Sequence, residues 1–228
     1  MKGIKTFRPV SILPDFFRNL VNLKYSTMKK IFFSALPAVA IALAGFHVND
    51  PLPIGASLPS PELKMKDVSG KEVSFKEVTK KNGLLVMFSC NTCPYVVKNQ
   101  SRTREVCAYA QANDIGVVVL NSNEANRGDD DSYNAMKEYA VDQQYKWYYL
   151  VDKNSVMADA FGAKRTPECY LFDKNGKLVY HGAIDDNPSD PGAVGRKHLV
   201  SAINEVKAGK DVSVKESRSV GCSIKRNS

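Results

Sequence analysis

Two cysteines separated by two residues, Cys90 and Cys93, form the motif of this sequence best suited to chemistry. They follow the apolar run 84–89 and precede Pro94, so a buried strand should end and a helix should begin here. A thiolate at a helix amino terminus is stabilised by the helix dipole and by free backbone N–H groups, which lower its pKa. The pattern predicts a redox dithiol. Cys90, expected to be exposed, would be its nucleophile and Cys93 its resolving thiol.

A structural zinc half-site is the alternative for such a pair. A closed zinc site needs four ligands, commonly as two close pairs. The sequence contains neither a second C-x-x-C nor an H-x-x-x-H motif. We therefore expect no metal and no other cofactor.

The elements that must position the pair alternate along the chain. Apolar runs predict buried strands at 84–89, 115–121 and 147–151. Amphipathic or capped segments predict helices at 94–113, 131–144, 155–161 and 196–207. Hairpins are expected over 63–75 and 170–180. This order predicts an α/β sandwich with a central mixed sheet and right-handed crossovers.

A second signal lies about seventy residues downstream, at Thr166-Pro167, just before a predicted strand. Proline cannot donate a ladder hydrogen bond, so it suits the start of a strand, and an X-Pro bond there can be cis. An ordinary trans loop proline is the alternative. Together with the C-x-x-C pair and the element order, the cis form is favoured.

At this point the sequence resembles thioredoxin-fold proteins of the redoxin family, in their AhpC/TSA-like, peroxiredoxin-like branch. The resemblance covers about residues 53–225 and rests on C-N-T-C-P-Y (a C-N-x-C-P-Y motif), V-V-V-L-N-S-N, T-P-E-C-Y-L-F-D-K-N-G-K-L-V-Y-H-G-A-I-D-D and G-C-S-I-K. It implies a thioredoxin-like three-layer sandwich with a central mixed β-sheet and an N-terminal β-hairpin extension. It also implies a cis Pro167 packed against both cysteines, with Thr166 offering backbone groups to an extended peptide in a substrate-docking groove.

The sequence departs from true peroxiredoxins, which carry a peroxide-binding P-x-x-x-T-x-x-C loop. Counting back from Cys90 gives Met87 and Gly83, and counting back from Cys93 gives Cys90 and Val86. Neither set fits, so the resemblance concerns the scaffold and peroxidase activity is an alternative. The intervening dipeptide Asn91-Thr92 leaves the redox potential and the direction of electron flow open.

Four other residues lie near these motifs or are cysteines, and two of them are candidates for a role in this chemistry. Glu168 could be a proton relay to Cys93 if it is buried nearby, or an exposed acid at the start of a strand. Cys222, in a polar tail segment, is either an extra redox thiol or inert. Cys107 and Cys169 are expected to be small core residues.

The amino-terminal part of the chain predicts export. Met28-Lys29-Lys30, the apolar run 31–46 and the A-x-A site at 42–44 form the three-part pattern of a signal peptide. We divide the chain into a leader, a linker, a thioredoxin-like domain and a tail, at 1–44, 45–52, 53–209 and 210–228. The leader comprises a 27-residue upstream extension and the signal peptide. An uncleaved signal anchor that tethers the protein to a membrane is the alternative to a periplasmic or secreted protein.

The net charge of +8 does not indicate a nucleic-acid partner. Residues 1–44 hold seven basic side chains and one acidic side chain, Asp15, so they carry most of the excess. A nucleic-acid-binding protein needs basic residues clustered on its folded domain.

Three functions follow from these features. The leading hypothesis is an exported thiol–disulfide oxidoreductase that acts on protein disulfides and is recycled by a membrane or soluble thiol reductant. A thiol peroxidase acting on peroxides is the second. The third is a copper carrier, with two thiolates and a histidine such as His181 as ligands, because soft thiolates suit Cu(I).

Overall fold

The computed structural model of the chain describes residues 50–227. The predicted leader, residues 1–44, and most of the predicted linker lie outside the described residues. The end of the linker is described: the backbone N–H of Leu52 donates to the carbonyl of Phe161 (2.9 Å). None of the helices within residues 50–227 is long and apolar enough to cross a membrane.

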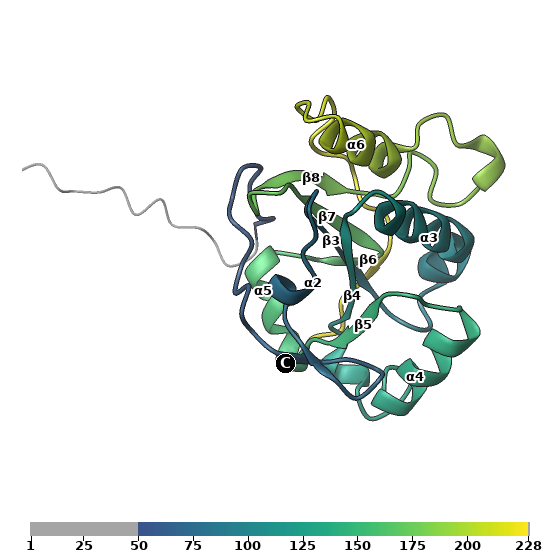
Figure 1. The fold of residues 1–228 in the computed structure, drawn as a ribbon. Coiled ribbons are helices and arrows are strands. Elements are labelled where there is room, and N and C mark those ends of the chain that lie inside the picture. Colours follow the sequence, from purple (N-terminus) through teal and green to yellow (C-terminus); the bar gives the residue numbers. More distant parts are fainter. Residues whose placement is uncertain (1–49, 228) are drawn as a thin grey trace, which may run out of the picture. The chain divides into compact units, whose positions relative to one another are not determined.

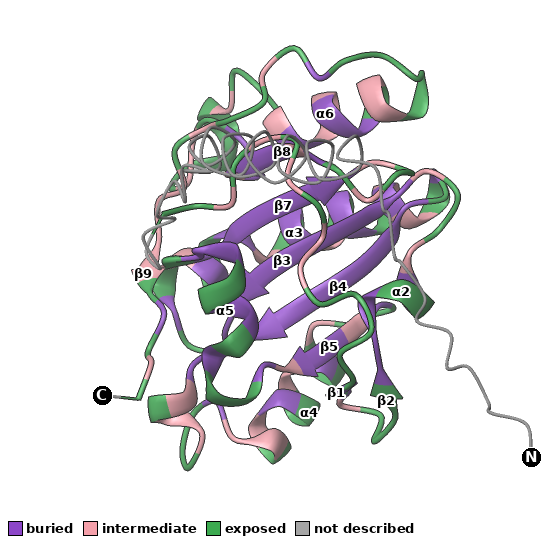
Figure 2. Cartoon of the chain, turned by 90° about the vertical axis from the view of Figure 1, so that its left-hand side faces the viewer, coloured by how far each residue is buried: buried purple, intermediate pink, exposed green. Residues whose placement is uncertain are grey.

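The centre of the fold is a five-stranded mixed sheet in the order β5-β4-β3-β7-β8 (Figure 1). Its strands are β3 (Leu84–Ser89), β4 (Gly116–Asn121), β5 (Tyr148–Val151), β7 (Glu168–Phe172) and β8 (Leu178–Gly182). The pairs β3–β4 and β4–β5 are parallel, whereas β3–β7 and β7–β8 are antiparallel. Every residue of the three central strands is buried, as Figure 2 shows, which explains their continuous apolar character.

Helices cover both faces of this sheet. One face packs against α3 (Pro94–Ala112), α4 (Tyr133–Asp142) and α6 (His198–Lys207), and the other packs against α2 (Phe75–Val78) and α5 (Val156–Phe161). Because successive strand residues point to opposite faces, the two cores alternate along β3: Leu85 and Met87 belong to the first, and Val86 and Phe88 to the second. The predicted three-layer, thioredoxin-like α/β sandwich is confirmed.

The predicted N-terminal hairpin is present, formed by β1 (Met65–Lys66) and β2 (Glu72–Val73). It lies beside β5, where the backbone N–H of Val68 donates to the carbonyl of Tyr149 (3.1 Å). The hairpin is shorter than expected, because Ser74 and Glu77 form a capping box that starts α2.

The segment predicted as a tail packs closely on the domain. Val212 and Ile224 are buried and join the cores of opposite faces of the sheet. A short strand, β9 (Cys222–Ser223), pairs antiparallel with β6 (Arg165–Thr166). No periodicity marks this pairing in the sequence, because two residues are too few for an alternating pattern.

Candidate active site

The C-x-x-C pair lies where the central strand β3 passes into α3. Cys90 follows the last residue of the strand, and Cys93 is the N-cap of the helix, with Pro94 in its first turn. Both thiols are buried: Cys90 is 2% and Cys93 5% exposed. The expectation that Cys90 is exposed is therefore wrong. Thr166 contacts its sulfur, and Cys222 packs against the cluster that contains both thiols.

Thr166, which precedes Pro167, contacts this pair. The peptide bond between them is cis. The hydroxyl oxygen of Thr166 lies 3.4 Å from the Cys90 sulfur, and its carbonyl oxygen accepts a hydrogen bond from the Cys93 thiol (3.4 Å). Thr166 thus contacts both thiols, one through its side chain and one through its backbone. A role of this loop in substrate docking stays a prediction.

The two thiols differ in acidity because they share a hydrogen bond. The bond from the Cys90 thiol lowers the pKa of Cys93 to about 4 against the opposing effect of burial, with smaller contributions from Cys222 and the Val96 backbone. The same bond raises the pKa of Cys90, as do burial and the charge of Asp131, and the Thr166 hydroxyl only partly offsets this. Of the two thiols, Cys93 therefore has the lower pKa.

A buried polar network that the sequence analysis did not identify fixes the loop between the cysteines. Asp131, fully buried, accepts hydrogen bonds from the Asn91 backbone N–H (3.0 Å) and from the side-chain amides of Asn121 (2.7 Å) and Asn123 (2.8 Å). The Tyr149 hydroxyl donates to the side-chain oxygen of Asn91 (2.8 Å). The sequence signal was weak: three polar residues at and after the end of the predicted strand 115–121, and an acidic loop.

Glu168 is buried, but its partners are not the thiols. One carboxylate oxygen accepts from the backbone N–H groups of Lys164 (2.8 Å) and Arg165 (3.0 Å), and the other pairs with Nε2 of His181 (2.8 Å). None of its hydrogen bonds within residues 50–227 reaches a cysteine. Glu168 therefore holds the segment that precedes the cis proline. His181 also stacks on the Tyr170 ring, with centroids 4.5 Å apart.

The remaining cysteines fall into two classes. Cys107 and Cys169 are fully buried in the core, as predicted, and burial raises the pKa of both. Cys222 is partly exposed and packs against Cys90 and Cys93. The structure thus brings three of the five thiols together.

No side chains in the described part of the chain form a group of three or more His, Cys, Asp or Glu residues arranged to hold a metal ion. The copper-carrier hypothesis gains no support, because His181 forms a hydrogen bond with Glu168.

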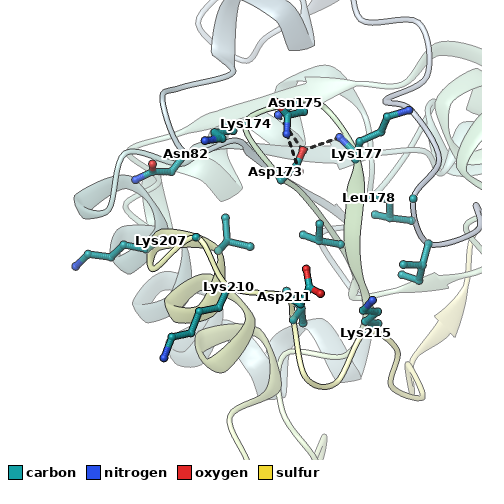
Figure 3. A pocket seen from close by; sticks show the side chains of 16 residues that line it. Asn82, Asp173, Lys174, Asn175, Lys177, Leu178, Lys207, Lys210, Asp211 and Lys215 are labelled. Carbon is teal, nitrogen blue, oxygen red and sulfur yellow. Dashed lines mark hydrogen bonds between the residues drawn. The ribbon is translucent and has the colours of Figure 1, made fainter.

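A pocket of about 410 Å³ is lined by Asn82 and the β7–β8 turn, with Lys207, Lys210 and Lys215 on its rim (Figure 3). The pocket lies at the opposite end of β3 from Cys90. Because a strand rises about 3.3 Å per residue, the six residues of β3 separate the two by about 20 Å. No cysteine lines the pocket.

Comparison with known proteins identifies the family of this chain. The Redoxin family model matches residues 53–195. A hypothetical protein from Sinorhizobium meliloti 1021 is 29% identical with a TM-score of 0.72, and the match covers 78% of this chain and 97% of that one. An uncharacterized conserved protein from Geobacillus kaustophilus is 31% identical with a TM-score of 0.71, covering 77% and 93%. A search of curated proteins gave no match.

A more distant structure shares the fold alone. A mutant of PrxQ from Xylella fastidiosa is 14% identical with a TM-score of 0.52, and the match covers 70% of this chain and 98% of that one. Redoxin proteins include thiol–disulfide oxidoreductases and peroxidases, in agreement with the enzyme class predicted from the cysteine pair. Because the family model spans more than half of the sequence, and the fold and the resemblance noted above agree with it, the chain belongs to the Redoxin family.

Proposed function

We propose that this protein is a thiol–disulfide oxidoreductase that works through the dithiol of Cys90 and Cys93. The observation that carries the proposal is the position of both thiols at the amino end of α3, in contact with Thr166 of the cis Thr166-Pro167 bond. At this position the neighbouring Cys90 thiol lowers the pKa of Cys93 to about 4. Cys93 is then a thiolate at neutral pH, and the thiolate is the nucleophilic form of cysteine. The proposed order of attack is therefore the reverse of the sequence prediction: Cys93 attacks first and Cys90 resolves.

The reaction follows from this charge distribution. The Cys93 thiolate attacks one sulfur of a substrate disulfide, the substrate S–S bond breaks, and the departing sulfur takes the electron pair. Cys93 is now neutral and bonded to substrate, so it no longer holds the Cys90 proton. Cys90 loses that proton to water and attacks the Cys93 sulfur. The second substrate sulfur leaves, and a Cys90–Cys93 disulfide remains.

In the reverse direction the same steps oxidise a substrate dithiol. The recycling partner therefore determines the direction of electron flow. A membrane or soluble thiol reductant would restore the dithiol after each reduction of substrate. The contacts of Thr166 with both sulfurs support a docking role for Thr166 and Pro167, because a substrate sulfur that reaches Cys93 must come close to this loop.

A comparison of variants in disulfide exchange tests the proposal. The rate of attack on a small disulfide, measured with reduced protein, should be lost in Cys93→Ser and retained in Cys90→Ser, whose hydroxyl can still donate to Cys93. Cys107→Ala is the matched control, because Cys107 is buried away from the site. Loss of attack in Cys90→Ser with retention in Cys93→Ser would restore the order predicted from the sequence. Normal rates in both variants would refute the function.

A thiol peroxidase is the second candidate, because a thiolate buried as deeply as Cys93 suits a small substrate. The thiolate would attack one oxygen of hydrogen peroxide, forming a sulfenic acid and releasing hydroxide. The rate of peroxide consumption by reduced protein distinguishes the candidates. A rate like that of an ordinary thiol leaves disulfide exchange as the chemistry, whereas a fast rate that depends on Cys93 makes the protein a peroxidase.

Export is part of the proposal and is supported by the sequence pattern. Met28-Lys29-Lys30, the apolar run and the A-x-A site would direct the chain across a membrane, with release after Ala44. An oxidising compartment also suits a protein that exchanges disulfides.

A further inference from the structure

The carboxy-terminal segment brings a third thiol to the active site. In Figure 1 the yellow C-terminal segment runs from α6 past β6 towards the C-terminus. Within it, β9 pairs antiparallel with β6, and Cys222 lies opposite Thr166, the residue that contacts both thiols of the pair. The side chain of Cys222 packs against the cluster of Cys90, Cys93 and Val96.

Cys222 lies beside Cys93, in the cluster that Cys90, Cys93 and Val96 form. After the larger effect of Cys90, the thiol and the backbone of Cys222 also lower the pKa of Cys93. The two sulfurs are therefore neighbours in the reduced protein, in which all five cysteines are free.

The pairing of this segment depends on Gly221. A Cβ atom at Gly221 would lie 2.1 Å from the carbonyl oxygen of Thr166 and 2.7 Å from its carbonyl carbon, far closer than atoms can pack. Only glycine allows the chain to approach Thr166 this closely and to place the next residue, Cys222, over the pair.

The residues after β9 anchor the segment on its other side. Ile224 is buried in the core and its N–H donates to the carbonyl of Lys164 (3.0 Å). The N–H of Lys225 donates to the side-chain oxygen of Asn123 (2.9 Å), and Arg226 pairs with Asp159 (2.7 Å). Contacts on both sides thus hold Cys222 in place.

We propose that Cys222 is a third redox-active thiol, which resolves disulfides formed at Cys93. The proposal deepens the proposed function and rests on it. After Cys93 has attacked a substrate disulfide, Cys222 loses its proton to water and the Cys222 thiolate attacks the Cys93 sulfur. The bond between Cys93 and the substrate breaks, the substrate sulfur leaves with the electron pair, and a Cys93–Cys222 disulfide forms. In this step Cys222 takes the resolving role of Cys90.

The charges around Cys222 support this order of events. In the reduced protein, burial and then the hydrogen bond and negative charge of Cys93 raise the pKa of Cys222, while Lys225 lowers it. Once Cys93 enters a disulfide its charge is gone, whereas Lys225 remains. Oxidation of Cys93 thus lowers the pKa of Cys222, so that a larger fraction of Cys222 is the nucleophilic thiolate.

The test uses the reduced mature chain carrying Cys90→Ser, so that Cys222 is the only neighbour able to resolve Cys93, and the aromatic disulfide 5,5′-dithiobis(2-nitrobenzoate). We expect two equivalents of thionitrobenzoate per protein, no lasting adduct, and a Cys93–Cys222 linkage on peptide mapping. The double variant Cys90→Ser/Cys222→Ser should release one equivalent and keep the adduct on Cys93.

Two further outcomes separate this inference from the proposed function. One equivalent released by Cys90→Ser, with a stable adduct on Cys93, overturns the role of Cys222 and leaves Cys93 as the nucleophile. No release, or an adduct on Cys222 alone, overturns the proposed function itself. Adding Gly221→Ala to Cys90→Ser tests the geometry with all other thiols in place. The adduct on Cys93 should then persist at least tenfold longer, while Gly128→Ala, at a glycine with open space around it, should change nothing.

Discussion

In its protonated form Cys93 donates to the carbonyl oxygen of Thr166, which precedes the cis Thr166-Pro167 bond, with 3.4 Å between sulfur and oxygen. Residues 73 positions apart in sequence thus share one contact at the amino end of α3. The same threonine contacts Cys90 through its hydroxyl and lies opposite Cys222 in the pairing of β6 with β9. Thr166 is therefore the residue around which the three thiols are arranged.

The acidity of Cys93 is open to direct measurement. Thiolate absorbance at 240 nm should appear in the reduced protein as the pH rises through about 4, because the Cys90 hydrogen bond lowers the pKa of Cys93 to that region. Below this pH Cys93 is protonated, so its reactivity with disulfides should fall as the pH falls. Cys90→Ala should raise the inflection by more than one pH unit, whereas Cys90→Ser should largely preserve it. A first inflection near 8–9, as in an ordinary thiol, would contradict the assignment.

The network around Asp131 should be important for stability. Asp131→Ala leaves three buried donors without their acceptor, on Asn91, Asn121 and Asn123. Each unsatisfied buried donor costs about 1–3 kcal/mol, so we expect a loss of roughly 3 kcal/mol or more in urea unfolding. Asp129→Ala, at an exposed position two residues away, should change stability by less than about 0.5 kcal/mol. Equal effects of the two variants would refute the role of the network.

Glu168 is expected to position the docking loop and not to move protons. Glu168→Gln should weaken the bonds to Lys164, Arg165 and His181 and lower the unfolding free energy by about 1–3 kcal/mol. The 240 nm inflection of Cys93 should stay where it is. Glu138→Gln, at an exposed site on α4, is the matched control. A shift in the thiol titration without a loss of stability would instead support a proton relay.

Processing of the leader can be read from the mass of the mature protein. Full-length protein expressed in a bacterial host and recovered from the exported fraction should begin at Gly45, because the A-x-A site ends at Ala44. Intact mass spectrometry identifies that end. Recovery of uncleaved chain in the membrane fraction would favour a signal anchor, and recovery of soluble uncleaved chain from the cytoplasm would refute export.

Local patterns in the sequence were enough to predict the frame of the site. Continuous apolar runs identify β3 and β4 because strands buried on both faces need apolar side chains at every position. Pro94 marks the start of α3, since a missing N–H costs nothing in the first turn. The chemistry of Cys90 and Cys93 and the cis Pro167 follow from spacing and residue type. The prediction of the cis proline also used the distant C-x-x-C pair and the element order, whereas the other signals lie within a few residues of the element that they predict.

The tertiary structure alone decided what surrounds the thiols. The burial of Cys90 and the hydrogen bond from the Asn91 backbone to the Asp131 carboxylate depend on residues far away in sequence, and the hydrogen bond of Glu168 with His181 depends on the pairing of two strands. Cys222 lies in a two-residue strand without hydrophobic alternation, so nothing local indicates its partner. Polar contacts of this kind depend on the path of the whole chain, because hydrogen bonds and charges act only over the few ångströms that folding establishes.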